Sequence, residues 1–191
     1  MNVQLPVHMD KSAFLAWVQG REERYELADG RVIMMVGATR VHGQIVTNLL
    51  ALLHGQLDPR QWTVIADFGL DAGPKTLRYA DIVVDRVGGG AGDFTATSPV
   101  LLAEVLSPST AQVDLGDKAA EYLRLPSLLA YLVFAQSGHK AYVWVRQADG
   151  MPPAPSIVVG RDKILRIAPL NLVLPLGAVY AGVEADDPFQ P

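Results

Sequence analysis

Residues 100–106 constrain the fold of this chain most, because the segment is apolar on both faces except at Glu104. A run of this kind is typical of a central strand that is buried on both sides of a sheet. A carboxylate is rarely buried without a partner, since removing water from its charge is costly. Something must therefore compensate the charge of Glu104, and a bound cation and an ion pair are the two simple candidates.

A second carboxylate occurs in similar surroundings. Residues 79–85 form another apolar stretch that predicts a strand, with Asp81 near its start. Alternation along this strand predicts that Asp81, Val83 and Asp85 share one face. If the two strands pair, Asp81 and Glu104 meet over one patch of the sheet. Two carboxylates there suit Mg²⁺ or Mn²⁺, which accept one or two carboxylates and keep several waters.

A lysine joins these acids from a helix expected over about 115–125. At about 100° per residue, Leu115, Ala119 and Tyr122 form its buried face, and Lys118 flanks that face beside Tyr122. The residues expected to point to solvent are Asp117, Glu121 and Arg124. A lysine on the flank can reach inward to an anionic site.

Each of these three residues also has an ordinary structural interpretation. Glu104 fits a structural ion pair, Asp81 fits a turn at a strand end, and Lys118 fits a surface lysine with a buried stem. Only their occurrence together, in the order Asp, Glu, Lys, favours an active site.

The whole chain predicts a single mixed α/β domain. Half of the 191 residues are apolar and 19% are charged, a balance that indicates a folded core. Because no repeat and no linker-like change of composition interrupts the chain, we expect one domain over residues 1–191. Its core should span about 14–145, followed by a C-terminal β-hairpin extension over 156–176 and a frayed acidic tail over 184–191.

Periodicity and turn signals predict the elements of this domain. Asp10 can cap a helix that Gly20 ends, and Asp29-Gly30 between two strand-like runs is typical of a hairpin. Apolar residues at helical spacing predict a long helix over 42–57. Strands are expected over 62–70, 79–85, 100–106, 131–135 and 141–146, with a last hairpin formed by 156–160 and 163–167.

Composition excludes several classes of protein. The chain has no cysteine, which excludes disulfides, thiolate nucleophiles and the usual structural zinc sites. Sixteen basic against twenty acidic residues give a net charge of −4, which disfavours nucleic-acid binding by bulk charge. Residues 1–11 lack a secretion signal and every apolar run is too short to span a membrane, so we expect a cytoplasmic protein with no membrane association.

Four stretches of the chain resemble a known family. The first is Tyr25-Glu26-Leu27 before Asp29-Gly30, and the second is His42 ahead of Asn48-Leu49. The third is the run 79–84 around Asp81. The fourth is the block 104–110, which begins at Glu104 and is followed by Lys118 and Tyr122. Together they resemble a large bacterial family of restriction-endonuclease-like proteins within the PD-(D/E)XK nuclease superfamily, over roughly residues 14–145. The resemblance implies a restriction-endonuclease-like core, in which helices flank a mixed central sheet with a metal site at one edge.

The resemblance also implies roles for individual residues. Asp81 and Glu104 match the motif acids that hold Mg²⁺ or Mn²⁺, and Glu26 matches an early glutamate that helps to hold or hydrate the metal. The main-chain carbonyl of Val105 would add a ligand. Lys118 would replace the motif lysine, whose usual position two residues after the glutamate is apolar here. Supporting roles are expected for Tyr122, Ser107 and His42.

Two positions depart from the family pattern. Ala80 stands before Asp81, where the family usually has proline, and residues 131–134 lack the tryptophan that is common after the tyrosine. Neither change touches an expected metal ligand.

The leading hypothesis is a Mg²⁺-dependent endonuclease that hydrolyses DNA phosphodiester bonds. A homodimer that concentrates basic residues in a cleft, or a partner that supplies affinity for DNA, would reconcile this activity with the acidic net charge. One alternative is a non-catalytic binding or regulatory module, in which the acids and the lysine form a buried ion-pair cluster without metal. The other is a metal-dependent hydrolase of a small phosphoester.

Overall fold

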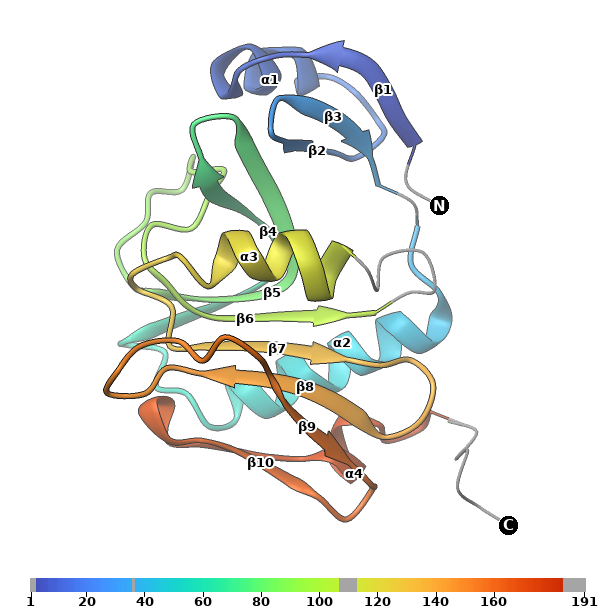
Figure 1. Cartoon of the computed structure of the whole chain (residues 1–191), viewed down its shortest axis with the longest axis vertical. Helices are drawn as coiled ribbons and strands as arrows, with labels where there is room; N and C mark the ends of the chain where they lie inside the picture. Colours follow the sequence, from blue (N-terminus) through green and yellow to red (C-terminus); the bar gives the residue numbers. More distant parts are fainter. Residues whose placement is uncertain (1–2, 36, 107–112, 184–191) are drawn as a thin grey trace.

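A computed structural model of the chain describes residues 3–35, 37–106 and 113–183. Its centre is a mixed sheet in the order β1-β3-β2-β5-β6-β7-β8-β9, with β4 paired to β5 (Figure 1). Only the pairing of β6 with β7 is parallel among the described strands. The strands are β1 (Val3–His8), β2 (Tyr25–Ala28), β3 (Arg31–Met34), β4 (Trp62–Gly73), β5 (Thr76–Arg86), β6 (Pro99–Val105), β7 (Ala130–Phe134), β8 (Lys140–Val145) and β9 (Ser156–Val159).

Helices cover both faces of this sheet. The apolar side of α2 (Arg40–His54) buries Ile45, Leu49 and Leu53 against one face. On the other face, α3 (Lys118–Tyr122) lies across β5 and β6 in front of the sheet (Figure 1). Its Tyr122 is fully buried beside β7. The central strand β6 is therefore buried on both sides, as its continuous apolar sequence predicts.

The sequence predictions for the N-terminal elements are confirmed. Helix α1 (Lys11–Val18) is capped by Asp10, whose side chain accepts a hydrogen bond from the amide of Ala13 at 2.8 Å. Strands β2 and β3 form a hairpin whose two turn residues, Asp29 and Gly30, have φ of 47° and 79°. Both angles are positive, as a two-residue hairpin turn of type I′ requires. The strand β1, which pairs with β3, was not expected from the sequence.

The predicted last hairpin is wrong. Strand β9 pairs with β8 at the edge of the main sheet, whereas β10 (Ile164–Ile167) pairs with β11 (Leu172–Pro175) in a separate two-stranded sheet. Leu165 and Ile167 of β10 are buried with the cluster under α2, while Ile157 of β9 is 58% exposed. The periodicity of these segments predicts strands correctly, but it carries no information on which strand lies beside which. The remaining short elements are η2 (Ala168–Leu170) and α4 (Leu176–Val179).

The helix expected over 115–125 differs from the prediction in its helix type and in its bounds. It opens with a π-helical turn, η1 (Val113–Asp117), and its α-helical part α3 ends at Tyr122. Leu115 is only half-buried, and Glu121 is half-buried rather than pointing freely to solvent. The extra residue in the π turn rotates the helix relative to the spacing of a regular α-helix.

Gly69 of β4 supplies a test of the fold. A Cβ atom built at Gly69 would lie 2.1 Å from the main-chain oxygen of Phe94, because the loop after β5 runs directly against β4. We expect Gly69→Ala to lower the free energy of unfolding by about 1–3 kcal/mol, measured by urea denaturation. The control is Gly43→Ala near the start of α2, where the added Cβ meets open space and should stabilise the helix by up to about 1 kcal/mol. Equal stability of Gly69→Ala and wild type would contradict the packing of this loop.

Candidate active site

The predicted acids meet where β5 and β6 separate. The two strands are paired as far as Ile82 and Ala103, and the next positions in that register are Asp81 and Glu104. Here side chains replace the main-chain ladder. The amide of Val105 donates a hydrogen bond to Asp81 Oδ2 at 2.7 Å, and the amide of Asp81 donates to Glu104 Oε2 at 3.4 Å. Each carboxylate therefore holds the main chain of the opposite strand.

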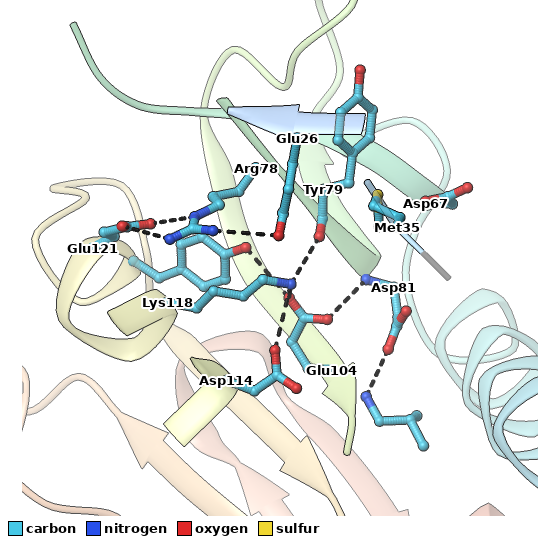
Figure 2. Close-up of polar contacts among 12 residues, drawn as sticks. Glu26, Met35, Asp67, Arg78, Tyr79, Asp81, Glu104, Asp114, Lys118 and Glu121 are labelled. Atoms are coloured by element: carbon cyan, nitrogen blue, oxygen red, sulfur yellow. Dashed lines mark hydrogen bonds and ion pairs between the residues drawn. The ribbon is translucent and has the colours of Figure 1, made fainter. Parts of the chain in front are cut away.

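Lys118 reaches this point from α3. Its Nζ lies 3.0 Å from Glu104 Oε1 and 3.4 Å from Asp114 Oδ1, and it donates to the carbonyl oxygen of Tyr79 at 3.3 Å (Figure 2). The hydroxyl of Tyr122 donates to the same Glu104 oxygen at 3.3 Å. The structure thus brings Asp81, Glu104, Lys118 and Tyr122 together.

Burial controls the electrostatics of this group. Glu104 and Lys118 are 3% and 6% exposed. Burial raises the pKa of Glu104 well above its ordinary value, which Lys118 opposes and the charges of Asp81 and Asp114 reinforce. Burial lowers the pKa of Lys118, but Glu104 and the other acids around it outweigh burial and raise that pKa well above its ordinary value. The lysine therefore keeps its proton.

His42 contacts the second carboxylate oxygen of Asp81. The side chain of Thr39 caps α2 by accepting a hydrogen bond from the amide of His42 at 3.1 Å, so His42 occupies the first turn. Its Nε2 lies 3.2 Å from Asp81 Oδ1. Burial lowers the pKa of His42, but the hydrogen bond and charge of Asp81 outweigh burial, and the pKa is raised. His42 and Val105 between them hold both oxygens of Asp81.

Glu26 is near the site but contacts a different partner. It is 2% exposed, and its Oε1 lies 3.3 Å from Arg78 Nη1. Its Oε2 is buried and has no hydrogen-bond partner among the described residues. Within residues 3–35, 37–106 and 113–183, no three acidic or histidine side chains are arranged as a group that could hold a metal ion. The roles of Glu26 and of the Val105 carbonyl as ligands stay predictions, and Ser107 lies outside the described residues.

Two charged residues of this region, Arg78 and Asp114, were not recognised in the sequence. Arg78, buried in β5, donates to both oxygens of Glu121, at 2.7 and 2.9 Å, as well as facing Glu26. Asp114 is 2% exposed and pairs with Lys118. The sequence could have indicated the role of Asp114, because this residue precedes Lys118 by four positions, the spacing of neighbours on one helix face. Arg78 could have been noticed as a charged residue inside a strand with buried neighbours.

Comparisons with known proteins agree with this fold. The family model Uma2, described as "Putative restriction endonuclease", matches residues 12–176. Two uncharacterized proteins of the cyanobacterium Synechocystis are similar: sll1609 is 32% identical over 132 residues, covering 66% of this chain and 75% of the relative. The second, slr1290, is 28% identical over 142 residues, covering 72% and 74%.

A solved structure has the same fold. It is described as a "putative nuclease belonging to DUF820" from Anabaena variabilis, shares 15% sequence identity and superposes with a TM-score of 0.74. The match covers 90% of this chain and 97% of the other. The predicted restriction-endonuclease-like fold is therefore confirmed. Within the described residues, every helix is too short or too polar to cross a membrane.

The pairing of Lys118 with Glu104 predicts a large effect on stability. Lys118→Met removes the ammonium and leaves a buried carboxylate without its cation, so the free energy of unfolding should fall by roughly 3–5 kcal/mol. Adding Glu104→Gln to the same protein should recover part of that loss, because Glu104 then carries no charge; the recovery stays incomplete because Asp114 still loses its contact with Lys118. The control Lys163→Met breaks an exposed pair with Asp162 and should cost less than about 1 kcal/mol. Urea denaturation in the presence of chelator measures all three, and a Lys118→Met protein as stable as the control would contradict the buried pair.

The raised pKa of His42 predicts a pH-dependent stability. A group whose pKa is raised by folding stabilises fully below its unfolded pKa of about 6.5, and this contribution disappears as pH rises through the folded value. In metal-free buffer, the stability advantage of wild type over His42→Gln should therefore shrink between neutral and alkaline pH. In an Asp81→Asn background the same comparison should lose this trend. A difference that stays constant with pH in both backgrounds would contradict the His42–Asp81 pair.

Proposed function

The chain belongs to the Uma2 family, and on that premise we propose that it is an endonuclease that uses Mg²⁺ or Mn²⁺ to hydrolyse DNA phosphodiester bonds. The observation that carries the proposal is the pair of carboxylates, Asp81 and Glu104, at the separation of β5 and β6 with the ammonium of Lys118 3.0 Å from Glu104. The description of the family and of the solved relative as nucleases supports the same class of reaction.

The residues present suit a divalent cation. Mg²⁺ is usually bound by one or two carboxylates and several waters, and does not need a cage of many side chains. Around the separation of β5 and β6, the carboxylates of Glu26, Asp81, Glu104 and Asp114 outnumber the cationic side chains. One oxygen of Glu26 is buried and finds no hydrogen-bond partner in the part of the chain that the structure describes. Asp81 and Glu104 would hold the ion together with the main-chain carbonyl of Val105. The free oxygen of Glu26 would accept a hydrogen bond from one of its waters.

Hydrolysis requires a water oxygen to bond to phosphorus while the bond from phosphorus to the leaving oxygen breaks. The metal, when bound, supplies a positive charge that neutralises the phosphate and makes water more acidic. Lys118 donates hydrogen bonds, either orienting the attacking water or stabilising charge on the phosphate oxygens. Tyr122 donates to the Glu104 oxygen that Lys118 also contacts, and His42 holds the second carboxylate oxygen of Asp81. These contacts fix the acids before substrate arrives.

Binding of DNA has to overcome the net charge of −4. Affinity for a duplex comes mainly from lysine and arginine against phosphates. We therefore include in the proposal a homodimer that brings the basic residues of two chains into one cleft, acting in the cytoplasm.

A second function is favoured by one specific observation. Lys118 and Tyr122 already compensate Glu104 Oε1 directly, so the cluster is electrostatically reasonable without a metal. In that case the chain would be a non-catalytic binding or regulatory module on a nuclease fold. The two functions differ in whether the acids bind metal and whether the lysine is needed for chemistry.

Metal binding tests the proposed ligands. Titration calorimetry with Mn²⁺ should show binding to wild type and none to Asp81→Ala or Glu104→Ala, because each change removes a carboxylate ligand. The control Asp162→Ala changes an exposed acid of the loop before β10 and should bind as wild type does. Unchanged Mn²⁺ affinity in both site variants would refute the assignment.

Cleavage of DNA tests the reaction. Wild type with Mg²⁺ or Mn²⁺ should nick supercoiled plasmid, and Lys118→Ala should reduce the rate by about 100-fold or more, as the loss of a transition-state donor does. Lys163→Ala should nick at the wild-type rate. Metal binding without nicking would favour hydrolysis of a small phosphoester, and the absence of both would favour the non-catalytic module.

A further inference from the structure

We propose that Arg78 is a positioning residue of this active site, which holds Lys118 against Glu104 by binding Glu121 on the same helix. The inference rests on the proposed function. The polar partners of Arg78 among the described residues are Glu121 and Glu26 rather than Glu104 or Asp81, so its effect on chemistry would pass through Lys118 and Glu26.

Arg78 forms a fork between two carboxylates. Its Nε and Nη2 donate to Oε2 and Oε1 of Glu121 at 2.7 and 2.9 Å, and its Nη1 lies 3.3 Å from Glu26 Oε1 (Figure 2). Two parallel hydrogen bonds from a planar guanidinium fix orientation as well as distance. The side chain of Arg78 is 3% exposed and that of Glu26 is 2% exposed, whereas Glu121 is 22% exposed, so water reaches the fork only from the side of Glu121.

The helix that carries Lys118 needs such a restraint. Helix α3 has five residues, follows the π-helical turn η1, and starts at Asp117 without a side-chain cap. A helix of this length is not stable through its own hydrogen bonds. Its rotation about its own axis must therefore be set by contacts with the sheet.

Glu121 is placed to set that rotation. It follows Lys118 by three residues, so the two side chains leave the helix on neighbouring sides. When Arg78 holds Glu121, Lys118 is directed to Glu104, and Tyr122 follows to the same oxygen. A turn of α3 away from the sheet would withdraw both donors together.

The restraint begins on the strand that carries the first acid. Arg78 precedes Asp81 by three residues in β5, and the carbonyl of Tyr79 between them accepts a hydrogen bond from Lys118. One rigid strand thus fixes Asp81 directly and Lys118 through Glu121. Arg78 also binds Oε1 of Glu26, whereas Oε2 of that residue has no hydrogen-bond partner among the described residues.

The test uses variants that keep charge or shape but lose the fork. Glu121→Gln keeps the length of the side chain and loses its charge, and Arg78→Lys keeps the charge but cannot bind two oxygens at once. Glu121→Asp keeps both oxygens and should recover part of the lost function. The matched control is Arg60→Lys, which breaks an exposed fork of the same kind to Asp58, remote in sequence from these residues.

Two readouts separate positioning from a structural role. Acetylation of Lys118 by acetic anhydride, followed by mass spectrometry, should be slow in wild type and Arg60→Lys and faster in Glu121→Gln and Arg78→Lys. In plasmid nicking with folded protein, these two variants should lose about 100-fold in kcat, as a misplaced catalytic group does, while KM and Mn²⁺ affinity stay unchanged.

The outcomes distinguish this inference from the proposed function. Nicking by both variants at the wild-type kcat would overturn the positioning role of Arg78 and leave the nuclease standing. If wild type does not nick, the proposed function fails, and the acetylation rate still decides whether Arg78 holds Lys118 in place. Unchanged acetylation in both variants would overturn the restraint itself.

Discussion

The arrangement of this protein depends on the compensation of one buried charge. Glu104 lies in the central strand, buried on both faces of the sheet, where an ionised carboxylate is costly unless several partners surround it. Those partners come from β5 and α3: the amide of Asp81, the ammonium of Lys118 and the hydroxyl of Tyr122. The pairing of β5 with β6 ends at Ile82 and Ala103, and at the next positions the contacts of the two carboxylates take the place of main-chain hydrogen bonds.

The candidate active site lies where β5 and β6 separate. Both acids face the gap from strands that are rigidly paired a residue away, while the amine comes from a short helix fixed by side chains. In the proposed nuclease, the acids that hold the metal must move little, and the amine must be directed to the substrate without binding the metal. Acids on paired strands and an amine on a separate helix would meet both requirements.

Glu104 is recognisable in the sequence without knowledge of its neighbours, because its strand is otherwise apolar. Asp81 lies in a mostly apolar run that also contains Asp85, so it stands out only together with Glu104 and Lys118. The hairpin at Asp29-Gly30 was equally local. The predictions that were wrong concern features that depend on contacts between segments far apart in the sequence. Periodicity could not show that β10 avoids β9, and Glu121 looked solvent-facing because its partner, Arg78, lies 43 residues earlier in the chain.

The most direct test of the central claim is a crystal structure determined with Mn²⁺, using the anomalous signal of the ion. We expect one peak at the separation of β5 and β6, within bonding distance of a carboxylate oxygen from Asp81 and from Glu104, with Lys118 beside it. A structure without a peak there, in which Glu104 is compensated by its protein partners only, would contradict the proposed metal site.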